Sequence, residues 1–229
     1  MNMRSIYLLI SLLVVSLGCK SETMHMDSTT HFTYLALGDS YTIGEGVEEN
    51  KRYPLQLQDS LRKNDIHLDT VQIIARTGWT TDELNTAIDN ASLKDAYDMV
   101  TLLIGVNNQY RGRSTENYLE EFAALLQRAI AFAGNNPSKV IVISIPDWGV
   151  TPFAEGRDRE QIALEIDAFN AINREQAQKA GVAWVNVTPV SREAAQRVEL
   201  LAQDGLHPSG LMYSYWVELL IPYALQILQ

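Results

Sequence analysis

A serine and a histidine, each within a short polar motif, are the residues of this 229-residue chain best suited to acyl transfer. Ser40 directly follows an apolar stretch, and His207 is preceded three positions earlier by Asp204. A serine hydroxyl becomes an effective nucleophile when a base takes its proton, and histidine is the usual base. A carboxylate behind the histidine fixes its tautomer and stabilises the imidazolium. These three residues are a candidate nucleophile, base and orienting acid.

Each of these residues also has an ordinary structural interpretation. Asp39 and Ser40 suit a turn or a helix cap, and Pro208 suits the start of the last helix. Taken alone, either motif favours that interpretation. Of the four histidines, only His207 stands between an Asp-Gly pair and a proline. Its setting supports the catalytic hypothesis.

Two loops offer hydrogen-bond donors for an oxyanion. Gly78 follows the second predicted strand, and a glycine lets the backbone N–H approach a substrate closely. Asn107 follows the third predicted strand and carries a side-chain amide. Alone, Gly78 is typical of a turn and Asn107 of any loop. Their position at successive strand ends favours a shared site.

The elements that must position these residues follow from the hydrophobic pattern. Five short, nearly continuous apolar runs predict buried parallel strands at residues 33–37, 71–75, 99–104, 140–145 and 182–187. Amphipathic stretches between and after them predict helices at residues 54–63, 80–90, 116–132, 159–179 and 211–228. This alternation predicts an α/β protein, a three-layer α/β/α sandwich with a flavodoxin-like, doubly wound five-stranded parallel sheet. Sites in such folds lie at the carboxyl ends of strands.

With these motifs in this order, the chain resembles the SGNH (GDSL-type) hydrolases, which are esterase- and lipase-like. The four family blocks correspond to residues 38–40, 76–81, 105–108 and 204–207, and they span nearly the whole mature domain. The resemblance implies Ser40 as nucleophile, His207 as base and Asp204 as orienting acid. It also implies an oxyanion hole made by the backbone N–H groups of Ser40 and Gly78 and the side chain of Asn107. It implies a carboxylic ester hydrolase without cofactor or metal.

One position departs from the family pattern. The third block usually ends in aspartate, and here Asn108 stands there. In the family this aspartate is taken as a support of the loop rather than a catalytic group. We therefore expect a small effect on loop stability and little effect on activity.

The N-terminus resembles a bacterial lipoprotein signal. Residues 1–18 predict a signal peptide, with Arg4 before a short apolar run. Cys19, the only cysteine, is the candidate lipidation site, although Ser16 stands where such signals usually carry leucine. Residues 19–31 predict a flexible tether and residues 32–229 the hydrolase domain. We expect an exported lipoprotein, membrane-anchored through Cys19 in the periplasm or at the cell surface; the alternative is a secreted soluble protein.

Composition and missing motifs narrow the other function classes. A formal charge of -10 argues against nucleic acid as a partner, and no protein partner is evident. No Gly-x-Ser-x-Gly surrounds Ser40, and no metal-ligand spacing is present. The segment 38–46 lacks the lysine of a phosphate loop, which makes a nucleotide module a weak hypothesis. The remaining alternative is a catalytically degenerate surface lipoprotein that binds a ligand.

The expected partner is a small ester substrate, whose identity stays open. Short-acyl esters, lysophospholipids, thioesters and acetylated sugars are all compatible with the motifs. Six loop residues are candidates for the pocket wall: Tyr41, Ile43, Trp79, Tyr110, Trp148 and Phe153. Arg111 and Arg113 could meet an anionic or sugar group, or could simply be solvated.

Overall fold

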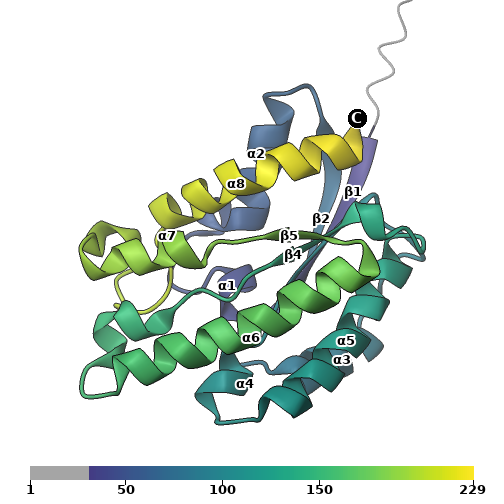
Figure 1. Cartoon of the computed structure of the whole chain (residues 1–229). Helices are drawn as coiled ribbons and strands as arrows, with labels where there is room; N and C mark the ends of the chain where they lie inside the picture. Colours follow the sequence, from purple (N-terminus) through teal and green to yellow (C-terminus); the bar gives the residue numbers. More distant parts are fainter. Residues whose placement is uncertain (1–30) are drawn as a thin grey trace, which may run out of the picture.

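The computed structural model describes residues 31–229 (Figure 1). The predicted signal peptide, Cys19 and the tether up to residue 30 lie outside the described residues. The first strand begins at His31, one residue before the predicted start of the domain.

The predicted fold class is confirmed: a five-stranded, all-parallel sheet with the order β2-β1-β3-β4-β5 lies between two helical layers (Figure 1). The strands are β1 (His31–Gly38), β2 (His67–Ala75), β3 (Met99–Leu103), β4 (Val140–Ile143) and β5 (Ala183–Val185). β3 and β4 are buried along their whole length. This burial explains their continuous apolar runs, since both faces of the sheet are covered.

β2 is longer than its apolar pattern predicted. It begins at His67 rather than at residue 71, because His67 already pairs with His31 of β1, and Leu68 pairs with Phe32. β2 lies at the edge of the sheet, where polar side chains can face solvent. The prediction from continuous apolar runs therefore found only the second half of β2.

One helical layer consists of α2 (Tyr53–Arg62) and α8 (Gly210–Leu228), which pack against each other on one face of the sheet (Figure 1). α8 is long and apolar enough to meet the composition criterion for a membrane span. In the fold it is a core helix, because Tyr213, Trp216 and Leu220 are fully buried. Packing thus accounts for the apolar side chains on its buried face, while Leu211, Leu219 and Tyr223 on the same helix are exposed.

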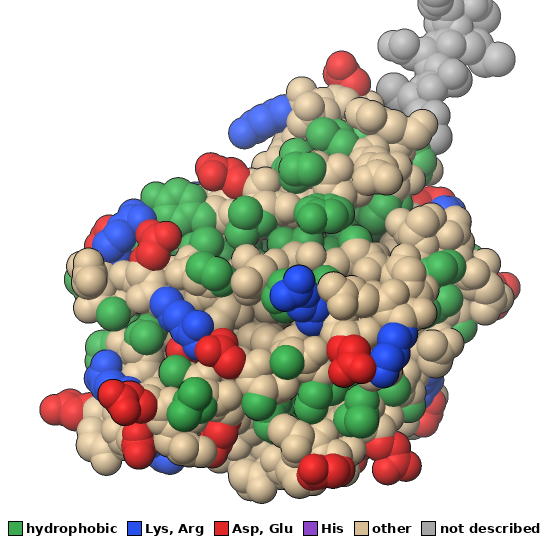
Figure 2. Space-filling view, in the orientation of Figure 1, with side chains coloured by type: hydrophobic (Ala, Val, Ile, Leu, Met, Phe, Trp, Pro, Cys, Tyr) green, Lys and Arg blue, Asp and Glu red, His purple; other side chains and the backbone are tan. Residues whose placement is uncertain are grey.

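The other layer consists of α3 (Thr81–Asp89), α5 (Thr115–Phe132) and α6 (Arg159–Ala180) (Figure 1). Thr80 and Glu83, in capping-box spacing, form that motif at the start of α3: the backbone N–H of Thr80 donates to the Glu83 carboxylate at 2.9 Å. Charged side chains of both signs are interspersed on the face shown in Figure 2.

Several short helical segments were not predicted, because they are shorter than the window that reveals a helical period. The α-helical ones are α1 (Ser40–Ile43), α4 (Val106–Tyr110) and α7 (Thr188–Arg192). The 3₁₀ segments are η1 (Glu49–Lys51), η2 (Pro137–Lys139), η3 (Trp148–Val150), η4 (Pro152–Ala154), η5 (Glu193–Ala195) and η6 (Val198–Leu200). Two of them, α1 and α4, carry predicted site residues.

The strand register brings three loops to one level. Gly38, at the end of β1, pairs with Ala75 of β2 on one side and with Leu103 of β3 on the other. The chain therefore leaves all three strands at the same edge of the sheet. β1 is also the strand from which the connections diverge, to β2 on one side and β3 on the other, and such a switch point is the usual binding crevice of this fold.

Candidate active site

Ser40 lies at the first position of α1, directly beyond β1. Asp39 caps this helix by accepting a hydrogen bond from the backbone N–H of Tyr41 at 3.0 Å. Gly38 makes the sharp exit from the strand possible: a Cβ there would lie 2.1 Å from Thr42 Oγ1 and 2.4 Å from the Leu103 carbonyl oxygen. Ser40 is consequently held on a tightly packed turn, with only 4 % of its surface exposed.

His207 and Asp204 lie together on the loop before α8. The side chains approach to 2.7 Å between His207 Nδ1 and Asp204 Oδ2. The other carboxylate oxygen accepts the backbone N–H groups of Leu206 and His207, each at 3.0 Å. Burial raises the pKa of Asp204, but the hydrogen bonds from His207 and Leu206 outweigh it and hold the pKa below its usual value. The ionised carboxylate only accepts, so Nδ1 carries the proton and leaves Nε2 as the basic nitrogen.

The loop around this pair is fixed by backbone bonds. Ala202 N–H donates to the His207 carbonyl at 2.7 Å, and Ser209 N–H donates to the Leu200 carbonyl at 2.7 Å. These bonds close a compact turn over residues 200–209. The His207 side chain is therefore held by its own loop as well as by Asp204.

Gly78 and Asn107 lie in the loops that follow the second and third strands, and both line one pocket. Gly78 has φ of +87°, a conformation that favours glycine, and its carbonyl accepts a hydrogen bond from Arg111 at 2.6 Å. The Asn107 amide nitrogen donates to the Trp79 carbonyl at 2.9 Å. Since an amide nitrogen carries two hydrogens, one N–H of Asn107 stays available.

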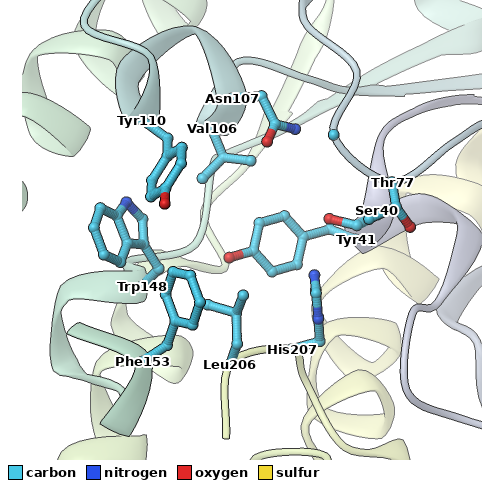
Figure 3. Close-up of a pocket in the computed structure, with 11 residues that line it drawn as sticks. Ser40, Tyr41, Thr77, Val106, Asn107, Tyr110, Trp148, Phe153, Leu206 and His207 are labelled. Atoms are coloured by element: carbon cyan, nitrogen blue, oxygen red, sulfur yellow. The ribbon is translucent and has the colours of Figure 1, made fainter. Parts of the chain in front are cut away.

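One pocket of about 160 Å³ joins the predicted residues. Its lining includes Ser40, Gly78, Asn107 and His207, while Asp204 lies behind His207. In Figure 3, Asn107 and His207 lie on opposite sides of the pocket, and a ring nitrogen of His207 points toward Ser40. Among residues 31–229 no hydrogen bond joins the Ser40 hydroxyl to His207 directly. Such bonds often tighten only when a substrate binds.

The sequence profile of the GDSL-like Lipase/Acylhydrolase family matches residues 36–215. The chain belongs to this family. The protein is therefore a member of a hydrolase family, and the resemblance noted from its four motifs is confirmed to that extent. Among curated proteins, none matches the chain closely enough to count as a relative.

Solved structures of GDSL-type hydrolases share the fold. A lipase/acylhydrolase from Enterococcus faecalis superposes with a TM-score of 0.69 at 18 % identity, covering 86 % of this chain and 97 % of the other. TesA gives 0.63 at 20 % identity, over 86 % and 99 % of the two chains. An acetyl xylan esterase from Geobacillus stearothermophilus gives 0.63 at 15 % identity, over 84 % and 94 %. At these identities the likeness concerns the fold alone.

The structure explains why this GDSL-family chain carries Asn108. The side chain is fully buried; its oxygen accepts the Thr81 N–H at 3.1 Å and its nitrogen donates to the Thr81 hydroxyl at 2.6 Å. The Thr81 hydroxyl in turn donates to Glu121. The single proton of the Thr81 hydroxyl is therefore committed to Glu121. The side chain at position 108 must consequently donate to the Thr81 oxygen, which an amide can do and an ionised carboxylate cannot. Asn108 matches Glu121 in this sense: Asn108 donates to the Thr81 hydroxyl, and Glu121 accepts from it.

Of the six candidate pocket residues, four line the pocket: Tyr41, Tyr110, Trp148 and Phe153. Ile43 and Trp79 are not among its lining residues. The two candidate arginines are engaged within the protein, since Arg111 pairs with Glu83 at 3.3 Å and Arg113 with Asp82 at 2.7 Å. Arg111 also donates to the Gly78 carbonyl and so braces the loop after β2, whereas Arg113 links the segment after α4 to α3.

Thr77, Val106 and Leu206 also line the pocket, although the sequence did not single them out. Each is next to a predicted site residue in the sequence, which is the one signal that could have indicated them. Within residues 31–229, no group of three or more His, Cys, Asp or Glu side chains is arranged to hold a metal ion.

Proposed function

We propose that this GDSL-family hydrolase cleaves carboxylic esters through an acyl-enzyme on Ser40. The observation that carries the proposal is the shared pocket: a buried serine, a histidine bonded to a carboxylate at 2.7 Å, and two potential oxyanion donors meet around one cavity. This combination is what acyl transfer by a serine requires.

In the proposed cycle, His207 Nε2 removes the Ser40 proton as Oγ bonds to the ester carbonyl carbon. The negative charge that develops on the carbonyl oxygen accepts hydrogen bonds from the N–H groups of Ser40 and Gly78 and from the Asn107 amide. Asp204 stabilises the imidazolium, which then protonates the leaving alcohol oxygen as the carbon–oxygen bond breaks. Water repeats the sequence, releasing the carboxylic acid and restoring Ser40.

The oxyanion donors are supported by their surroundings. Among the described residues, the Gly78 N–H donates to no protein group, and the bond from Arg111 to the Gly78 carbonyl fixes the orientation of the loop. Removing one oxyanion donor typically costs about 3–4 kcal/mol of transition-state stabilisation. The bonds that orient Gly78 and Asn107 are therefore important for rate.

The favoured substrate class is a small, short-acyl ester. The cavity of about 160 Å³ is smaller than the roughly 300 Å³ at which pockets for drug-sized ligands begin. One structural neighbour is an acetyl xylan esterase, so an acetylated sugar belongs to the substrates to be assayed. Lysophospholipids and thioesters complete the panel.

The decisive test is Ser40→Ala. We expect the variant to lose hydrolysis of 4-nitrophenyl acetate and labelling by a fluorophosphonate probe, with an unchanged melting temperature. Ser214→Ala, on α8 and outside the pocket, is the matched control and should keep both properties. Near-normal turnover by Ser40→Ala would overturn the proposal. An unlabelled wild-type protein would instead favour a ligand-binding surface lipoprotein.

We also propose that the chain is exported and anchored through a lipidated Cys19. This proposal comes from the N-terminal sequence pattern. Mass spectrometry of the protein from a membrane fraction tests it, and an unmodified Cys19 in a soluble protein would contradict it.

A further inference from the structure

Tyr41 differs from the other buried tyrosines of residues 31–229 in having an unpartnered hydroxyl. The hydroxyls of the others bond to Thr101 (Tyr34 and Tyr53), Gln72 (Tyr97), the Ile104 carbonyl (Tyr118) and the Tyr41 carbonyl (Tyr213). The Tyr41 hydroxyl forms no hydrogen bond with any described residue, although only 3 % of the residue's surface is exposed. Since Tyr41 lines the pocket, a hydroxyl without a protein partner there is available to hydrogen-bond a ligand.

The Tyr41 side chain is held firmly in the pocket. Its ring packs edge-on against His207, with centroids 5.7 Å apart, and also contacts Trp216. Its backbone carbonyl accepts the Tyr213 hydroxyl at 2.9 Å. Figure 3 shows the ring lying across the pocket, with the hydroxyl directed away from Ser40 toward Trp148 and Phe153.

Most polar atoms at the far end of the pocket are engaged within the protein. The Trp148 indole N–H donates to Gln109 at 2.8 Å, and Gln109 in turn donates to Glu165 at 2.6 Å. The Tyr110 hydroxyl accepts a hydrogen bond from Arg157 at 3.2 Å. These bonds fix the aromatic end wall. The Tyr110 hydroxyl keeps its own proton, but that side chain is 43 % exposed, whereas Tyr41 is buried and presents its donor to the inner part of the pocket.

The hydroxyl is a neutral donor over the working pH range. Burial, followed by the nearby charges of Asp39, Asp147 and Asp204, raises the pKa of Tyr41 far above its ordinary value. The matching ligand atom is a hydrogen-bond acceptor, such as an ether, hydroxyl or carbonyl oxygen.

We propose that the pocket binds the acyl part of the substrate and selects short acyl groups that carry an oxygen, to which Tyr41 donates. This rests on the proposed function, in which the acyl group stays attached to Ser40 while the alcohol departs. The part of the pocket between Ser40 and Trp148 then suits the acyl group, and its volume of about 160 Å³ favours a group of a few atoms. A site built to bond a substrate oxygen discriminates against the analogue that lacks it.

The test uses two pairs of 4-nitrophenyl esters that differ by one ether oxygen in place of a methylene: methoxyacetate with butyrate, and 3-methoxypropionate with pentanoate. For each pair, the ratio of kcat/KM for the ether ester to that for the methylene ester is measured in wild type and Tyr41→Phe. Intrinsic ester reactivity cancels between the two enzymes. We expect the ratio to fall about 5–10-fold in Tyr41→Phe for at least one pair, the size of one neutral hydrogen bond.

Tyr110→Phe is the comparison variant at the same pocket: this side chain is 43 % exposed, so water competes for its hydroxyl and we expect the ratio to stay unchanged, whereas an equal fall would assign the donor to Tyr110 instead. Tyr41→Phe should also keep its melting temperature, since its hydroxyl has no protein partner to lose. An independent measure needs no variant: the wild-type ratio should exceed the ratio for hydroxide alone by about 5-fold.

Unchanged ratios in both pairs, with butyrate still hydrolysed through Ser40, would overturn this inference and leave the proposed function intact. Failure of wild type to hydrolyse any ester faster than Ser40→Ala would instead overturn the proposed function. The two failures are therefore distinguishable.

Discussion

Two aspartates close to Ser40 have opposite environments. Asp204 is partly exposed and receives three hydrogen bonds, from two backbone N–H groups and from His207, which hold its pKa low. Asp39 is fully buried, receives the Tyr41 N–H on one oxygen, and its other oxygen has no partner among the described residues. Burial raises the pKa of Asp39 from 3.8 to about 7. Hydrogen-bond donors lower the pKa of Asp204, whereas desolvation raises the pKa of Asp39.

The two carboxyls should consequently affect stability in opposite directions as pH changes. The folded pKa of Asp204 is depressed, so its stabilising contribution is present above the unfolded pKa and is lost as the pH falls through the folded value. The folded pKa of Asp39 is raised, so its contribution is full below about pH 4 and is lost as the pH rises through about 7. Of the two carboxyls, Asp204 is therefore the one that is fully ionised at neutral pH and contacts the His207 ring.

The largest expected effect comes from Asp204→Asn. An asparagine amide would face His207 Nδ1 with a donor and favour the wrong tautomer, so we expect kcat for 4-nitrophenyl acetate to fall roughly 10³–10⁴-fold. The matched control is Asp167→Asn, which removes a surface partner of Arg192 and should leave kcat unchanged. A decrease of less than tenfold in Asp204→Asn would mean that Asp204 does not orient the base.

A smaller effect, on stability, is expected from Asp39→Asn. The amide keeps an acceptor for the Tyr41 N–H but cannot ionise, so the variant should gain stability relative to wild type as the pH rises from 4 to 8. The pKa shift from 3.8 to about 7 sets the upper limit of this gain at about 4 kcal/mol.

The measurement for Asp39→Asn is the urea midpoint of both proteins at several pH values. Asp59→Asn, at an exposed position whose partner Arg62 stays charged throughout, serves as the control and should show no such gain above pH 5. A stability difference that stays constant from pH 4 to 8 would show that Asp39 is not held neutral.

The smallest effect is expected from Asn108→Asp, which adds a second buried carboxyl beside that of Asp39 to the comparison. The new carboxylate would compete with Glu121 for the single Thr81 proton, so we expect a loss of about 1–3 kcal/mol in the free energy of unfolding at pH 7. The loss should shrink on acidification, and the double variant with Glu121→Gln should recover most of it. Unchanged stability at pH 7 would contradict the proposed match between Asn108 and Glu121.

Much of the fold could be predicted because buried parallel strands leave a strong pattern. The runs beginning at Met99 and Val140 coincide with the start of β3 and β4, since both faces of these strands are covered. The first half of β2 was missed because an edge strand tolerates polar residues. α1 and α4 were missed because four or five residues cannot show a helical period.

The sequence by itself determined the fold class and the candidates Ser40, Gly78, Asn107, Asp204 and His207. These inferences depend on local patterns: apolar periodicity and short motifs at the ends of predicted strands. Only the tertiary structure decided that Arg111 braces Gly78, that Asn108 matches Glu121, and that the Tyr41 hydroxyl is left without a partner. Each of these facts depends on which distant groups come within 3.5 Å once the chain is folded, because a hydrogen bond is short-ranged and directional.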